Sequence, residues 1–132
     1  MDRNTLRTIE ACKGRTITRI WFEQEHEDTD VLCIGFSNGT VLKIWDRLEC
    51  CEKRYMRTDD NLDYFVGARF KGVRLKGRPK YRPMKHDYYD THGVQFMEVE
   101  TNKGSFVIAN HDEFRGNYAG FNIQATIEDM VQ

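Results

Sequence analysis

Cations alternate with aromatic residues in one short stretch of the chain, which runs from Arg78 to Tyr89. Its sequence is Arg-Pro-Lys-Tyr-Arg-Pro-Met-Lys-His-Asp-Tyr-Tyr. Guanidinium groups bind phosphates through paired hydrogen bonds and aromatic rings stack on bases, so this composition is typical of nucleotide recognition. We expect Lys80 and Arg82 to contact phosphates and Tyr88 to stack on a base. Single-stranded nucleic acid suits the same chemistry, and a solvated segment whose tyrosines pack on a sheet has this composition too, so all three interpretations stay open.

A second polar segment spans residues 110–121 and reads Asn-His-Asp-Glu-Phe-Arg-Gly-Asn-Tyr-Ala-Gly-Phe. It lies between two expected strands and carries more polar groups than a turn needs. Arg115 is expected to hold a phosphate, and Phe114 or Tyr118 to stack on a base. The alternative is an ordinary connecting loop with Tyr118 and Phe121 in the core.

The sequence favours binding over catalysis. It contains no Gly-x-Ser-x-Gly, no P-loop and no Gly-x-Gly-x-x-Gly. His111, Asp112 and Glu113 are adjacent, and adjacent residues of an extended segment point to opposite faces, so the three cannot ligate one ion together. We therefore predict no enzyme activity, no cofactor and no metal.

The chain has four cysteines, Cys12, Cys33, Cys50 and Cys51. They contain no Cys-x-x-Cys pair of the kind found in zinc sites. Cys33 is expected in the core.

Charge is separated along the chain although the net charge is only −1. Residues 23–30 hold five acids and no base, whereas residues 66–86 hold eight bases and no acid. Such blocks predict an acidic face and a basic face, with the basic one meeting an anionic partner. Two solvated loops at opposite ends of a barrel would give the same pattern, so that alternative stays open.

Length and hydropathy predict one soluble domain. Domains usually hold about 100–150 residues, and the chain has 132. No apolar stretch approaches the roughly 18–20 residues of a membrane span. The first residues contain no apolar region of the signal-peptide type. We expect a single cytoplasmic domain over residues 1–132 that does not associate with a membrane.

The expected elements are a short helix followed by strands. An apolar stripe over residues 4–13, stopped by Gly14, predicts the helix and makes residues 1–14 a helical appendage. Two sequences are typical of hairpin turns, namely Asn38-Gly39 and Asn102-Lys103-Gly104. Residues 59–64 are typical of a helical turn with an acidic N-cap. The fold class is therefore mainly β, a small β-sandwich or barrel of about seven short strands; these are expected at residues 16–22, 31–36, 41–45, 68–75, 94–101, 105–109 and 118–125.

Residues 76–93 do not fit that series. They contain both prolines, Pro79 and Pro83, and each proline removes a hydrogen-bond donor that a central strand needs. We expect a long basic and aromatic loop here, and loops of this length are usually functional or mobile.

The order of several motifs resembles a family of small, mostly phage-encoded proteins of unknown general role. The resemblance covers residues 31–125, and its only distinctive element is the Cys-Cys-Glu of Glu49-Cys50-Cys51-Glu52, which follows a strand and its turn. It continues through the acidic segment 59–63, Gly67 before a strand, the hairpin at 94–106 and the tail at 110–121. The basic segment 76–85 does not align. Within this family the chain is most similar to the anti-Thoeris sponge proteins of phages.

That resemblance implies a β-sandwich that oligomerises and sequesters a cyclic ADP-ribose signal without cleaving it, with cyclic oligonucleotides as further ligands. The expected function is immune evasion in the cytoplasm of the host cell by binding a small cyclic nucleotide, as a homo-oligomer. The alternatives are a protein–protein inhibitor of a host defence complex that uses the acidic segment 23–30, and a single-stranded nucleic-acid binder that uses residues 66–86. The candidate ligand-binding residues, nominated from chemistry and rough placement, are Arg57, Asn110, Phe114, Arg115, Tyr118, Lys80, Arg82 and Tyr88.

Overall fold

The computed structural model describes residues 1–26, 29–47, 52–85, 88–115 and 120–130, and the backbone alone for residues 25 and 26. Within these ranges the fold is mainly β with one short α-helix, as the sequence predicts. The elements in chain order are α1 (Arg3–Glu10), β1 (Ile17–His26), β2 (Thr29–Phe36), β3 (Thr40–Asp46), β4 (Lys53–Arg57), the 3-10 helix η1 (Leu62–Phe65), β5 (Phe70–Pro83), β6 (Thr91–Thr101), β7 (Gly104–Phe114) and β8 (Ile123–Asp129).

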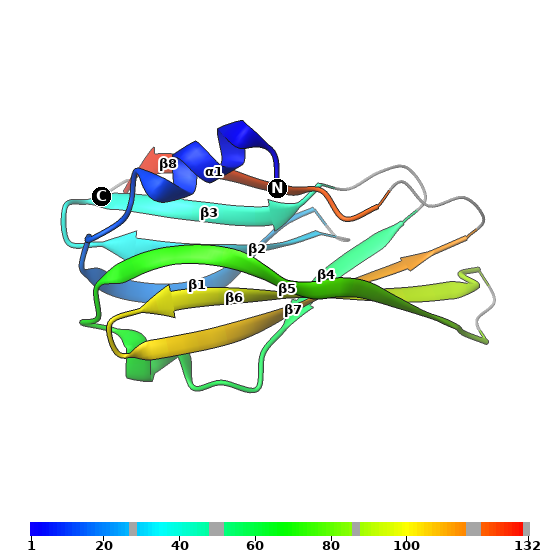
Figure 1. Cartoon of the computed structure of the whole chain (residues 1–132). Coiled ribbons are helices and arrows are strands. Elements are labelled where there is room, and N and C mark those ends of the chain that lie inside the picture. The colour runs from blue at the N-terminus through cyan, green and yellow to red at the C-terminus, as the bar shows by residue number, and fades with distance from the viewer. Residues whose placement is uncertain (27–28, 48–51, 86–87, 116–119, 131–132) are drawn as a thin grey trace.

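The strands form one sheet that curls into a half-barrel (Figure 1). Its order is β5-β6-β7-β4-β2-β3-β8, and β1 pairs with β2 outside this path. Strand β4 joins the two halves, because it is antiparallel to β7 and forms a single parallel bridge to β2 between Arg54 and Thr29. The start of β5 returns to the start of β1 through an antiparallel bridge between Thr16 and Arg69. The curl therefore brings the residues before β5, the strand at one end of the path, against the residues before β1.

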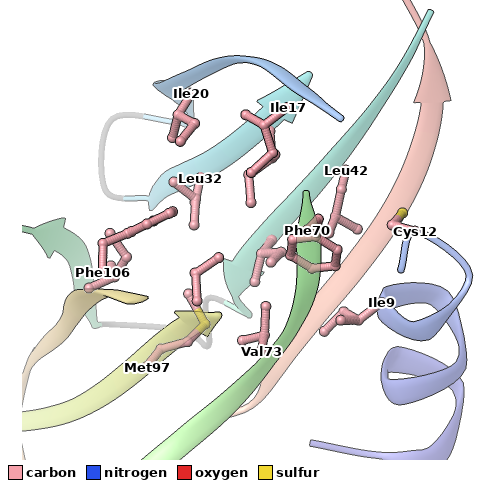
Figure 2. Close-up of a cluster of buried hydrophobic side chains, with 14 of the residues drawn as sticks. Ile9, Cys12, Ile17, Ile20, Leu32, Leu42, Phe70, Val73, Met97 and Phe106 are labelled. Atoms are coloured by element: carbon pink, nitrogen blue, oxygen red, sulfur yellow. The ribbon is translucent and has the colours of Figure 1, made fainter. Parts of the chain in front are cut away.

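The concave face holds the hydrophobic core (Figure 2). Alternate residues of each strand point inward, which is the two-residue period expected of a sheet with one apolar face. The rings of Phe36 on β2 and Phe70 on β5 meet edge to face at 5.7 Å. Asp2 is the N-cap of helix α1, and its Oδ1 accepts a hydrogen bond from Thr5 N at 2.7 Å; the helix adds the buried Ile9 to the core. Cys33 is fully buried, as predicted.

Two predicted turns are confirmed. Asn38 and Gly39 connect β2 to β3, with Gly39 at φ 83°, and Gly104 begins β7 with φ 114°. A positive φ costs glycine little, which explains its place at these turns. The predicted helical turn forms as η1, but its N-cap is Asn61 rather than an acid. No described helix is long and apolar enough to cross a membrane.

The predicted loop over residues 76–93 is wrong. Its first part continues β5 to Pro83, and its last part belongs to β6, which begins at Thr91. The prolines are tolerated because β5 is an edge strand, where one row of donors needs no partner. Pro79 lies in an irregularity of the pairing between Lys76 and Lys80. The true connection is short and covers residues 84–90.

Two other boundaries differ from the prediction. The last strand is β8, displaced toward the C-terminus from the predicted 118–125. Strand β4 was not predicted, because its sequence Lys-Arg-Tyr-Met-Arg has no apolar alternation. Its inward positions are occupied by Arg54 and Met56, and a buried arginine is indistinguishable from a surface arginine in the sequence.

Gly93 provides a test of the packing between β5 and β6. A Cβ atom there would lie 2.8 and 2.9 Å from ring atoms of Tyr81, whose ring also meets Phe114 edge to face. We expect Gly93→Ala to lower the free energy of unfolding by about 1–3 kcal/mol, because overpacking displaces the ring. Urea denaturation followed by circular dichroism measures the loss. The double variant with Tyr81→Leu should recover part of it, and unchanged stability in Gly93→Ala would contradict this packing.

Candidate functional site on the outer face of the sheet

Four neighbouring strands, β4, β7, β6 and β5, carry a patterned outer face. Residues directly opposite each other in antiparallel strands point to the same side, so the pairing register gives rows of neighbours across the sheet. Two rows matter for binding, and each has a cation on β5 at its end; they are Tyr55–His111–Val94–Lys80 and Arg57–Ala109–Phe96–Lys76.

Three adjoining hollows form a groove over these rows, and we call it the outer groove. Their volumes are about 430, 370 and 430 Å³, within the roughly 300–1,000 Å³ of small-molecule sites. All three share Phe96, which is 37% exposed although it is a large aromatic residue. The floor is apolar and consists of Phe96, Val94, Val107 and Ala109.

Cations gather on one side of the outer groove. Strand β5 contributes four that line it, Lys76, Arg78, Lys80 and Arg82. The opposite side, after β4, combines Arg57 with acidic residues in the segment 58–60. The groove therefore has one strongly basic side and one side of mixed charge.

A stack of three rings holds one end of the groove in place. The ring of His111 lies 4.9 Å from that of Tyr55 and 5.0 Å from that of His92, in nearly parallel planes. His92 Nε2 and His111 Nδ1 are 2.8 Å apart, and Arg82 Nε donates to His92 Nδ1 at 3.3 Å. Because Nδ1 of His92 accepts from Arg82, the proton of His92 lies on Nε2, from which it is donated to His111.

Both histidines are neutral at pH 7. Burial, together with the neighbouring His92 and the arginines, lowers the pKa of His111 to about 4. Burial and Arg82 lower the pKa of His92 as well. Because His92 is neutral, its Nδ1 can accept the hydrogen bond that orients the Arg82 guanidinium.

The structure brings three of the predicted site residues together. Arg57, Lys80 and Arg82 come from β4 and β5 and all line the outer groove. Arg115 is exposed just after β7. Tyr88 lies in the β5–β6 connection, where its ring meets that of Tyr89 edge to face at 4.9 Å.

Asn110 and Phe114 lie on the opposite side of the sheet. They are 1% and 5% exposed and point inward from β7, so they do not share a surface with the cations of the outer groove. The expectation that the polar segment 110–121 lies between two strands is therefore wrong for residues 110–114, which belong to β7. Tyr118, Cys50 and Cys51 lie outside the described residues.

Sequence reasoning missed His92, Phe96 and Tyr55 as site residues. The available signal was the alternation His92, Val94, Phe96 along β6, which places the three side chains on one face. Among the described residues no group of three or more His, Cys, Asp or Glu side chains is arranged to hold a metal ion.

The inner face beneath this region contains a buried charge cluster around Arg54. Arg54 is 2% exposed; it donates from Nε to Glu52 Oε2 at 3.0 Å and forms an ion pair with Asp46. Asp112 Oδ1 lies 3.9 Å from Arg54 Nε, and neither carboxylate oxygen of Asp112 has a hydrogen-bond partner among the described residues. Burial raises the pKa of Asp112 to about 7. The cluster connects β4 to β7 and to the end of β3.

Part of the predicted acidic face takes part in contacts within the fold. Glu23 accepts a hydrogen bond from Trp21 Nε1 at 3.1 Å and pairs with Lys43 at 3.2 Å. Asp30 Oδ2 accepts from Met56 N at 2.9 Å. Residues 27 and 28 lie outside the described ranges.

Comparison with known families assigns the chain to one of them. The model of a family described as a domain of unknown function, DUF7448, matches residues 10–123. The chain belongs to the DUF7448 family. The matched range runs from the last residue of α1 to the first residue of β8, so the DUF7448 domain contains the whole outer groove. No curated protein and no solved structure matches the chain, and none of these comparisons links it to the anti-Thoeris proteins.

Proposed function

We propose that this DUF7448 protein binds a small anionic nucleotide in the outer groove and holds it without cleaving it. The observation that carries the proposal is the row of four β5 cations beside an exposed aromatic floor. Phosphate pairs well with arginine and lysine, and a base stacks on an aromatic ring. Neither feature is required by the fold, since the outer face of a sheet can be simply polar.

Each part of the groove has a role in this proposal. Lys80 and Arg82 contact the phosphate, and Arg82 is oriented by its hydrogen bond to His92. The base lies on Phe96 beside the small Ala109, which leaves room above the sheet. Holding Arg82 before the ligand arrives reduces the entropy lost on binding.

The finer part of the proposal is that the ligand is a signal of the cyclic ADP-ribose type or a cyclic oligonucleotide. Its support is the resemblance to the phage anti-Thoeris proteins, and it includes an anti-defence role in the cytoplasm of a host cell. A sponge must bind tightly, and nanomolar affinity corresponds to about −12 kcal/mol. The hollows lie open on the outer face, so a second copy of the chain would supply the other wall, which makes a homo-oligomer part of the proposal.

Reversing two charges in the groove tests the proposal. We expect Lys80→Glu with Arg82→Glu to weaken nucleotide binding by about 100-fold or more, because each hydrogen bond to a charged group contributes about 1.5–3 kcal/mol. Isothermal titration calorimetry measures the affinity for the ligand that binds best in a native mass spectrometry panel of cyclic ADP-ribose isomers and cyclic di- and trinucleotides. Arg3→Glu with Lys13→Glu, at exposed positions at the start of α1 and after it, makes the same change in charge away from the groove and should bind normally.

The panel also separates the alternatives. No adduct with any nucleotide would refute the proposal, and release of a cleaved product would indicate an enzyme. Tighter binding of longer single strands, with affinity falling steeply as salt rises, would indicate a nucleic-acid binder instead.

A further inference from the structure

The two sides of the outer groove differ in the groups they can bind, and this difference carries a further inference that rests on the proposed function. The β5 side presents cations, whereas the other hollow is lined by Arg57, Asp59 and Asp60. Ionised carboxylates only accept hydrogen bonds and repel phosphate. A nucleotide therefore has a favoured direction in the groove, with its phosphate at β5.

The segment 58–60 is fixed to β7 by hydrogen bonds at both of its ends. Thr58 Oγ1 donates to Val107 O at 2.8 Å, and Asp60 Oδ2 accepts from Val107 N at 2.8 Å. Asp60 N in turn donates to Thr58 Oγ1 at 3.1 Å. The carboxylate of Asp60 is thus already used to anchor the segment.

Asp59 lies between these two anchored residues and is exposed at the groove. Within the described ranges no hydrogen bond or ion pair of its carboxylate is found, so both oxygens can accept from a ligand. Arg57 lines the same hollow, and its guanidinium lies over the Tyr55 ring at 4.9 Å. This end of the groove offers an acceptor and a donor together, beside the apolar floor at Phe96 and Ala109.

Of the common bases, guanine matches this combination best. Its Watson–Crick edge carries O6 as acceptor and N1–H with the N2 amino group as adjacent donors. A carboxylate accepts two parallel N–H bonds, and a guanidinium donates to a carbonyl oxygen. Adenine has one amino group and an acceptor nitrogen at the corresponding edge, so it leaves one carboxylate oxygen unmatched. We propose that the outer groove selects guanine nucleotides, with Asp59 and Arg57 contacting the base edge and the β5 cations contacting the phosphate.

The experiment compares matched guanine and adenine ligands by isothermal titration calorimetry: GMP with AMP, and cyclic di-GMP with cyclic di-AMP. The wild-type protein should bind the guanine member of a pair at least tenfold more tightly. Asp59→Asn replaces one acceptor oxygen by a donor, which matches the donor and acceptor of the adenine edge, so it should abolish the preference by weakening guanine binding and strengthening adenine binding. Asp63→Asn, at an exposed acid on η1 outside the groove lining, should keep the preference.

The possible failures can be told apart. Equal affinity for both members of the pairs, or a preference that survives Asp59→Asn, overturns the guanine assignment and leaves the outer groove as a nucleotide site. If neither pair binds, the guanine assignment fails, and the proposed function then fails too unless the wider nucleotide panel gives an adduct. A preference for adenine that is lost in Lys80→Glu with Arg82→Glu but kept in Asp59→Asn would support the outer groove as the nucleotide site. It would overturn the proposal that the groove selects guanine.

Discussion

Arg54→Met is expected to lower the free energy of unfolding by about 3–5 kcal/mol at pH 7, the usual cost of removing one partner from a buried ion pair. The side chain of Arg54 is 2% exposed and contacts Asp46 and Glu52, with Asp112 at 3.9 Å. Without the guanidinium these acids would remain buried with no cation among the described residues beside them. Since whole domains are stable by about 5–15 kcal/mol, much of the protein should unfold under mild denaturant.

Chemical denaturation at pH 7 measures this loss. Lys53→Met, at the exposed neighbouring position on β4, is the control and should change stability by less than about 0.5 kcal/mol. Adding Asp46→Asn, Glu52→Gln and Asp112→Asn to Arg54→Met should restore a large part of the loss, because none of the three carboxylates that face Arg54 is then left buried and unpaired. A loss below 1 kcal/mol in the single variant would show that the cluster does not hold β4 in place.

Asp112→Asn is expected to stabilise the protein at neutral and alkaline pH. Burial raises the pKa of Asp112 to about 7 from a usual value near 4, so the folded state keeps a proton that the unfolded state releases. Stability from this group is therefore lost as pH rises from about 4 to about 7, and the loss is complete above that interval. Three pKa units correspond to about 4 kcal/mol, which is the upper limit of the gain from Asp112→Asn at pH 8.

The measurement is urea denaturation of both proteins at pH 5 and at pH 8. The advantage of Asp112→Asn should be larger at pH 8 by roughly 2 kcal/mol or more, because most of the titration lies between these values. Asp129→Asn, at an exposed position on β8, should show no such difference. An advantage that does not change with pH would mean that Asp112 is ionised throughout and that Arg54 compensates it fully.

Local physical chemistry was sufficient for part of the fold. The turn at Asn38 and Gly39 depends on two residues that accept unusual backbone angles, and the short helix depends on an apolar stripe with a stop at Gly14. The alternation along β3 and β6 has a period of two residues, which requires no knowledge of the partner strand. These signals predicted the mainly β class with its N-terminal helix, and also predicted that His111 and Asp112 face opposite sides of a strand.

Only the tertiary structure decided where β4 lies, that β5 extends past Pro79, and which cations share a face. Strand β4 has no apolar pattern; its place in the sheet depends on pairing with β7 and on the burial of Arg54 among Asp46, Glu52 and Asp112, the last of which is distant in the sequence. Strand β5 tolerates its prolines because it is at the edge of the sheet, and edge position depends on the order of all the strands. The outer groove joins Arg57 to Lys80 and Arg82 through the pairing of β4, β7, β6 and β5, and the register between strands distant in sequence depends on how the whole core packs.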